Sequence, residues 1–167
     1  MNRIMIVGSP GSGKSTLSKM LSQKLGYPIL HLDKIYHIDN KNSISKEELK
    51  DRIAKFVETN EFFLIDGNYG STMEYRMQFV DTVIILDINT NICLENIEKR
   101  RLSNELRSDM AEGFDNSTFD DEFIEFVKSF RNNNLPKIKL LLSKYNYLQQ
   151  IYLKSYKAIE NFALSLG

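Results

Sequence analysis

A glycine-rich segment near the start of the chain has the residue types and spacing of a phosphate-binding loop. Residues 8–16 read GSPGSGKST and match the pattern G-x-x-x-x-G-K-[ST] at every fixed position. The glycines let backbone N–H groups turn toward phosphate oxygens, the lysine adds a positive charge near the β- and γ-phosphates, and the serine hydroxyl suits Mg²⁺. We therefore predict that this segment binds ATP and Mg²⁺. The predicted nucleotide contacts are Gly8, Ser9, Pro10, Gly11, Ser12, Gly13, Lys14, Ser15 and Thr16.

The sequence on either side of this segment supports the prediction. Residues 3–7 are a short apolar run typical of a buried strand, and Leu17, Leu21 and Leu25 recur at helical spacing before Gly26. The N-terminus of such a helix adds partial positive charge at the phosphates. The alternative is a glycine-rich turn that only caps a helix, but a chance match to the full pattern has odds of roughly 1% in a chain of ordinary composition.

A magnesium site needs a second ligand, and two aspartates at predicted strand ends qualify. Asp66 follows residues 61–65, and Asp87 follows residues 82–86. An acid at the end of a strand next to the glycine-rich loop is the usual partner of the loop serine. We favour Asp66 beside Ser15, because Gly67 permits close approach of a ligand. Asp87 is then a capping or structural residue.

An acceptor for the phosphoryl group would bind at the same edge of the sheet. Asp33 lies just past a predicted strand at residues 29–32, where ligands of open α/β sheets bind, and could contact or deprotonate an acceptor hydroxyl. A turn or capping aspartate is the alternative. His31 would share a strand face with Asp33, although a buried histidine with satisfied hydrogen bonds is its more expected role. Arg76 is predicted to hold the acceptor, with a surface salt bridge as the alternative.

Four arginines surround a segment without hydrophobic periodicity, residues 107–117. Phosphoryl transfer needs cations around the migrating group, and mobile loops often supply them. We expect two of the four to act, and a solvated helix face is the alternative for the others. Arg101 and Arg107 are assigned to catalysis, Arg100 to the nucleotide and Arg131 to the acceptor.

Short apolar runs alternate with helical patterns along the chain, which predicts an α/β fold with a parallel sheet covered on both faces. No linker composition interrupts residues 1–167, so we predict one domain. Asn132 to Asn134 are expected to end one helix, and Pro136 to open the next. The predicted strands are 3–7, 29–32, 61–65, 82–86 and 147–153. The predicted helices begin near residues 15, 45, 71, 90, 118, 136 and 155.

Composition narrows the function classes. Lys plus Arg and Asp plus Glu both number 22, so the chain lacks the excess positive charge typical of nucleic-acid-binding proteins. No apolar run approaches the roughly 20 residues of a membrane span. Cys93 is the single cysteine, and no signal-peptide pattern precedes the first strand. These features predict a cytoplasmic protein without membrane or nucleic-acid partners.

The order of these motifs resembles the adenylate-kinase-like P-loop kinases along essentially the whole chain. The segments LGYPILHLD, DGNYGSTMEYR, VIILD and RSDMAEG more closely resemble the group labelled DNA topology modulation proteins. The resemblance implies a three-layer P-loop NTPase fold, a five-stranded parallel sheet of order 2-3-1-4-5 and an arginine-bearing lid at about residues 100–118. It also implies that Lys14 binds phosphate, that Ser15 and Asp66 bind Mg²⁺, and that Asp33 stands where shikimate-kinase-like members place an acceptor-binding acid.

The sequence departs from adenylate kinases in one informative place. DGNYG at residues 66–70 replaces their DGFPR, and the span between Asp33 and Asp66 lacks their AMP-binding pattern. The leading hypothesis is therefore an ATP-dependent kinase that acts on a nucleotide or another small hydroxyl acceptor. The alternative is a nucleotide-dependent regulator acting on DNA topology or a protein partner. A GTPase switch is disfavoured, because no NKxD element follows a late strand.

Overall fold

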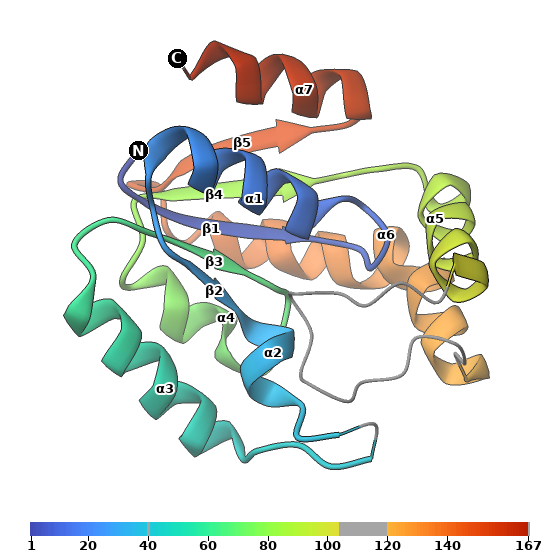
Figure 1. Ribbon diagram of the computed structural model, residues 1–167, viewed down its shortest axis with the longest axis horizontal. Coiled ribbons are helices and arrows are strands. Elements are labelled where there is room, and N and C mark those ends of the chain that lie inside the picture. Colours follow the sequence, from blue (N-terminus) through green and yellow to red (C-terminus); the bar gives the residue numbers. More distant parts are fainter. Residues whose placement is uncertain (40, 104–119, 167) are drawn as a thin grey trace.

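A five-stranded, fully parallel sheet forms the centre of the computed structural model, which describes residues 1–39, 41–103 and 120–166 (Figure 1). The order of its strands is β2-β3-β1-β4-β5, which confirms the predicted sheet. The strands are β1 (Arg3–Gly8), β2 (Ile29–His31), β3 (Phe63–Asp66), β4 (Thr82–Leu86) and β5 (Gln149–Leu153). The third and fifth strands begin two residues later than the apolar patterns predicted.

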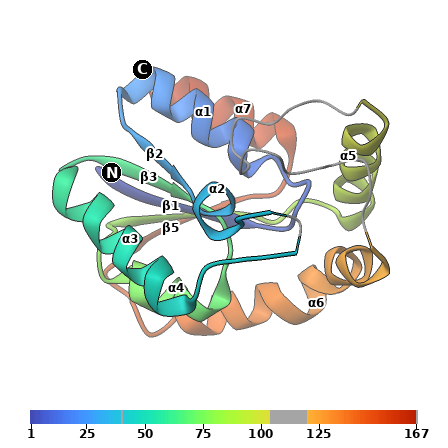
Figure 2. The same cartoon turned by 60° about the horizontal axis from the view of Figure 1, so that its bottom comes forward.

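Helices cover both faces of this sheet. Helices α1 and α7 lie on one face and α3, α4 and α6 on the other, as two views of the ribbon agree (Figures 1 and 2). Helices α2 and α5 lie at the end toward which the strands point (Figure 1). The helices are α1 (Lys14–Leu25), α2 (Leu32–Tyr36), α3 (Lys46–Thr59), α4 (Gly70–Met77), α5 (Thr90–Ser103), α6 (Asp121–Leu142) and α7 (Tyr156–Ser165).

The alternation of side chains along β1 explains why its apolar run is continuous. Met5 and Val7 pack into the cluster beneath α3, α4 and α6, whereas Ile4 and Ile6 pack into the cluster beneath α1, α5 and α7. All four side chains have no exposed surface. A strand that buries both faces needs apolar residues at every position, which is the pattern of parallel sheets covered by helices.

The prediction that Pro136 opens a separate helix is wrong. Helix α6 runs without interruption from Asp121 to Leu142, with Pro136 inside it. An internal proline costs about 3 kcal/mol through a lost hydrogen bond and a steric clash. Phe130, Leu135 and Ile138 are buried on both sides of Pro136, and each buried side chain of this kind contributes roughly 1.5–3 kcal/mol. Packing against the sheet therefore outweighs the local cost of the proline.

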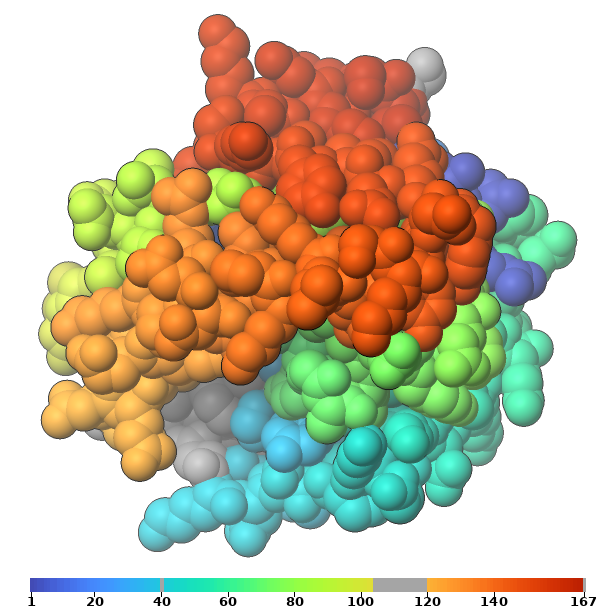
Figure 3. Space-filling view, turned by 180° about the vertical axis from the view of Figure 1, so that it is seen from behind, coloured from blue at the N-terminus to red at the C-terminus, as the bar shows by residue number. Residues whose placement is uncertain are grey.

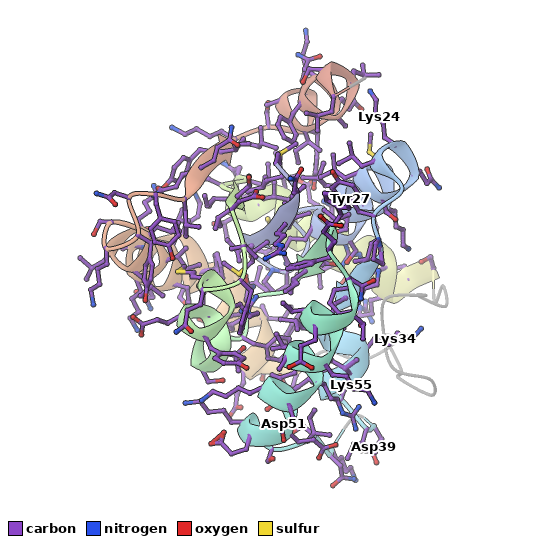
Figure 4. All side chains as sticks on the ribbon, turned by 90° about the vertical axis from the view of Figure 1, so that its left-hand side faces the viewer. Lys24, Tyr27, Lys34, Asp39, Asp51 and Lys55 are labelled. Atoms are coloured by element: carbon purple, nitrogen blue, oxygen red, sulfur yellow. The ribbon has the colours of Figure 1, made fainter. Side chains whose placement is uncertain are left out.

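Side-chain contacts at the surface tie the outer helices together. Helix α6 crosses one face of the molecule (Figure 3). On the opposite layer, Lys24 at the end of α1 lies close to α7 (Figure 4), and its Nζ donates to the carbonyls of Ala163 and Leu164, both at 2.8 Å. Within the described ranges, none of the helices has the length and apolarity required to span a bilayer.

Candidate active site

The glycine-rich loop connects β1 to α1 at the end of the sheet toward which the strands point. Gly11 has φ of 80°, a left-handed conformation that favours glycine. A Cβ atom at Gly11 would lie 2.3 Å from the carbonyl oxygen of Cys93, so the loop packs directly on the start of α5. Only glycine fits this contact. Glycine at this position is therefore required by the packing of the loop on α5, in addition to the predicted close approach of a phosphate.

Two polar residues, Lys14 and Ser15, begin α1 directly after the glycine-rich loop. Lys14 Nζ donates to the carbonyl oxygens of Gly8 at 2.9 Å and Ser9 at 3.0 Å. Ser15 Oγ donates to Asp66 Oδ2 at 2.9 Å. The pairing of β1 with β3 places Asp66 opposite Ile6, two residues before the loop begins, and so brings the carboxylate to α1.

Asp66 has the surroundings expected of a magnesium ligand. Its Oδ2 atom also contacts His31 Nδ1 at 3.0 Å, and the residue is only 5% exposed. Its Oδ1 atom has no hydrogen-bond partner among the described residues, although it is fully buried. A buried carboxylate oxygen without a donor, next to a serine hydroxyl, suits a hard cation that takes oxygen ligands. The residues present therefore fit Mg²⁺.

Asp87, the alternative metal ligand, has a different partner. Arg131 Nε, on α6, donates to Asp87 Oδ1 at 2.7 Å. Asp87 lies at the end of β4, and Ser15 bonds to Asp66 instead. In this arrangement Arg131 joins α6 to the sheet, and it is not among the residues that line the large cavity described below.

A second polar cluster lies at the position predicted for the acceptor. Asp33 lies in α2 rather than in a loop, and Tyr69 Oη donates to its Oδ1 atom. Tyr69 Oη also lies 3.2 Å from His37 Nε2. Burial and the nearby Asp33 carboxylate raise the pKa of Tyr69 well above its usual value, so the phenol stays protonated and donates. Tyr69 could not be identified from the sequence, since a tyrosine in a loop carries no specific signal.

The prediction that Arg76 holds the acceptor does not fit its position. The side chain has no exposed surface, so neither an acceptor nor a surface salt bridge reaches it. Its Nη1 donates to the carbonyl of Gly67 at 2.9 Å, and its Nη2 donates to the carbonyls of Asn68 and Tyr69. Burial lowers the pKa of Arg76 to about 9, which still leaves the guanidinium charged at neutral pH. Arg76 thus supports the loop between β3 and α4 from beneath.

One cavity of about 750 Å³ connects the glycine-rich loop with Asp33. Its wall includes four of the predicted residues that carry charge or a hydroxyl, Lys14, Ser15, Asp33 and Arg100. Much of the remaining wall comes from α4, α5 and α6 and is largely apolar. The lining residues that were not predicted include Met73, Phe123, Phe126, Phe130, Asn134 and Lys137.

A smaller cavity of about 330 Å³ lies beside the glycine-rich loop and is lined in part by Thr16, Lys99, Arg100 and Tyr156. The Tyr156 hydroxyl donates to the carbonyl of Gly11 at 3.1 Å. Arg100 therefore borders both cavities. Of the other predicted loop residues, Pro10, Gly11 and Gly13 line the larger cavity, whereas Gly8, Ser9 and Ser12 are buried.

Arg101, another predicted lid arginine, is not among the described residues that line either cavity. Arg101 is exposed and pairs with Glu98 on its own helix, with Nε 2.9 Å from Glu98 Oε2. Arg107 and most of the predicted lid at residues 100–118 lie outside the described residues. The sequence predicted that Arg100 contacts the nucleotide. It could not show which of the two consecutive arginines faces a cavity, because neighbouring residues on a helix point in different directions.

The chain is similar to adenylate kinases in sequence, and no protein-family model matches it. A Methanocaldococcus jannaschii protein with a provisional adenylate kinase name is 30% identical over 108 residues, covering 59% of this chain and 58% of that protein. An adenylate kinase of Francisella tularensis is 29% identical over 128 residues, covering 60% of this chain and 57% of the relative. The matched region thus spans less than two thirds of these relatives.

Solved structures with the same fold cover nearly the whole chain. Deoxyadenosine kinase from M. mycoides with bound dATP matches with a TM-score of 0.59 and 17% identity over 98% of both chains. Shikimate kinase from Bacteroides thetaiotaomicron matches with a TM-score of 0.54 and 19% identity, over 99% of this chain and 96% of the other. At these identities the similarity shows a P-loop kinase fold and nothing finer.

Proposed function

We propose that this protein is an ATP-dependent small-molecule kinase that transfers the γ-phosphoryl group to a hydroxyl of its acceptor. The observation that supports this most directly is the continuous cavity that joins Lys14 and Ser15 to Asp33. A donor site and an acceptor site that share one cavity allow in-line transfer without passage through water.

On the donor side, the chain supplies a charge and two oxygen ligands. Lys14 is held by the carbonyls of Gly8 and Ser9, and rotation about its side-chain bonds redirects Nζ to the phosphates. Ser15 and Asp66 would hold Mg²⁺. When bound, this ion neutralises charge on the β- and γ-phosphates. Arg100 borders the cavity and adds a further cation near the migrating group.

On the acceptor side, the chain supplies a carboxylate and an apolar wall. Asp33 can accept the proton of a hydroxyl as that oxygen attacks phosphorus, which is the usual role of such an aspartate in kinases. A carboxylate repels a phosphate group at the same position, so a hydroxyl acceptor fits better than a phosphate oxygen. Met73 and Phe130 in the wall favour an acceptor with an apolar or aromatic surface.

Relatives named as adenylate kinases and structural neighbours named as deoxyadenosine and shikimate kinases support this class of reaction. The experiment is a transfer assay with [γ-³²P]ATP, Mg²⁺ and each of AMP, 2′-deoxyadenosine and shikimate. We expect a labelled product from 2′-deoxyadenosine or shikimate, and none from the Lys14→Ala protein at the same concentration. Labelled ADP from AMP alone would show a phosphate acceptor and contradict transfer to a hydroxyl. Tight ATP binding without transfer to any acceptor would favour the nucleotide-dependent regulator instead.

A further inference from the structure

The loop between β3 and α4 holds an aromatic residue in an unusual backbone conformation. Tyr69 has φ of 36°, and among the described non-glycine residues it alone has a positive φ. The left-handed region is a rare conformation for a bulky residue, and such residues concentrate at functional sites where the surrounding structure holds them. The loop must therefore be fixed by contacts outside Tyr69 itself.

These contacts come from beneath the loop and from the glycine-rich loop beside it. The buried guanidinium of Arg76 donates to three successive carbonyls, those of Gly67, Asn68 and Tyr69. The side chain of Asn68 bonds to both the N–H and the carbonyl of Gly8, at 3.0 and 2.7 Å. The conformation of Tyr69 is thus tied to the donor site on one side and to a fully buried cation below.

The result of this conformation is the position of one hydroxyl group. Tyr69 Oη donates to Asp33 Oδ1 and lies 3.2 Å from His37 Nε2. The Tyr69 ring lies 4.6 Å from that of Tyr36, centroid to centroid, which limits its rotation. Asp33 Oδ2 receives no hydrogen bond from any residue of the described ranges, and Asp33 lines the cavity. One carboxylate oxygen is therefore fixed, and the other is available to a bound molecule.

We propose that Tyr69 is a positioning residue, which fixes the carboxylate of Asp33 so that its second oxygen accepts the hydroxyl of the phosphoryl acceptor. This inference rests on the proposed kinase function. It adds a residue to the acceptor site and explains why the chain maintains an unfavourable backbone conformation there. A purely structural Tyr69 would instead stabilise the fold independently of Asp33.

The test is a double-mutant cycle of Tyr69→Phe and Asp33→Asn. For each protein, kcat/KM is measured in the transfer assay with AMP, 2′-deoxyadenosine and shikimate. ATP hydrolysis, in which water is the acceptor, is measured as well. Tyr69→Phe removes one oxygen atom and keeps the ring, so the melting temperature reports whether the fold is intact. Tyr75→Phe is the matched control, because Tyr75 lies on α4 outside both cavities.

We expect Tyr69→Phe to lower kcat/KM at least about tenfold in the wild-type background, as hydrogen bonds to charged groups allow. In the Asp33→Asn background we expect less than a twofold loss, because the group that Tyr69 positions is already gone. Tyr75→Phe should stay within twofold of wild type. Equal losses from Tyr69→Phe in both backgrounds, or no loss in either, would overturn the inference.

The same four proteins distinguish failure of the inference from failure of the proposed function. If the wild type shows neither transfer nor hydrolysis, the kinase function fails. The coupling between Tyr69 and Asp33 is then measured from the free energies of urea-induced unfolding of the same four proteins. Non-additive changes in unfolding free energy would support a Tyr69 that holds Asp33, and additive changes would reject it.

Discussion

Adjacent arginines at the end of α5 illustrate how the structure separates residues that the sequence treats alike. Arg100 borders both cavities, whereas Arg101 is exposed and pairs with Glu98. The sequence prediction placed Arg101 in catalysis, because a run of basic residues does not show which member faces the site. In this structure we propose Arg100 for that role.

The pair makes a matched test. We expect Arg100→Ala to lower kcat at least tenfold, since it removes a cation near the transferring group. Arg101→Ala should change kcat by less than about twofold, because an exposed ion pair contributes at most about 1 kcal/mol. Steady-state kinetics with saturating Mg-ATP measures both. A larger loss from Arg101→Ala would return the catalytic role to that residue.

The two strand-end aspartates offer a second comparison. Asp66 bonds to Ser15 and keeps one buried oxygen without a described donor, whereas Asp87 pairs with Arg131. We expect Asp66→Asn to raise the Mg²⁺ concentration for half-maximal activity at least about tenfold, because one anionic ligand is lost. Asp87→Asn should leave that concentration within about twofold. Equal shifts in both variants would remove Asp66 from the metal site.

The β3–α4 loop explains the segment DGNYGSTMEYR better than sequence alone could. The sequence predicted Asp66 correctly as a strand-end acid beside the glycine-rich loop, because strand ends meet at one edge of a parallel sheet. It could not predict that Arg76 is buried, since arginines are almost never fully buried without partners and its partners are backbone carbonyls. The role of Tyr69 depends on a left-handed residue that no local pattern specifies.

Gly67 provides the prediction for this loop. It has φ of 138°, and a Cβ atom there would lie 2.9 Å from Leu32 Cβ, which is fixed close to the backbone of α2. We expect Gly67→Ala to lower the unfolding free energy by roughly 1–3 kcal/mol through this clash and the unfavourable φ. Urea unfolding followed by circular dichroism measures the change.

Gly70 is the matched control for that variant. A Cβ atom at Gly70 meets nothing within 4 Å, and the residue begins α4. Gly70→Ala should leave the stability unchanged or raise it by up to about 1 kcal/mol, because alanine restricts the unfolded chain. If both variants lose the same stability, the contact with Leu32 is not the cause.

For the whole molecule, the alternation of apolar runs was sufficient to predict an α/β fold, and the resemblance supplied the order of the strands. The features that the sequence did not predict depend on contacts between distant segments of the chain. Pro136 illustrates this, because local rules place it at a helix start, whereas α6 continues through it to bury side chains against the sheet. The apolar wall of the cavity could not be predicted for the same reason, since Phe123 and Phe130 come from a distant helix and line the same cavity as Asp33 only in the folded chain.

The proposed donor site joins residues of β1, α1, β3 and α5, and ligand binding should therefore stabilise the folded molecule. A ligand that binds only the folded state, at about 100 times its Kd, adds about 2.7 kcal/mol of stability. For a chain of this size, that corresponds to a rise of roughly 5–10 °C in the melting temperature. We expect Mg-ATP to produce such a rise, measured by scanning calorimetry.

Lys14→Ala provides the matched control for this prediction. Lys14 is partly exposed, and its Nζ donates to carbonyls of its own loop, those of Gly8 and Ser9. The melting temperature of the variant without nucleotide should stay within about 2 °C of wild type, because surface substitutions usually change stability by less than 0.5 kcal/mol. Its rise with the same Mg-ATP concentration should largely disappear. An undiminished rise would show that ATP binds elsewhere, because a nucleotide on the glycine-rich loop cannot lose its lysine without losing affinity.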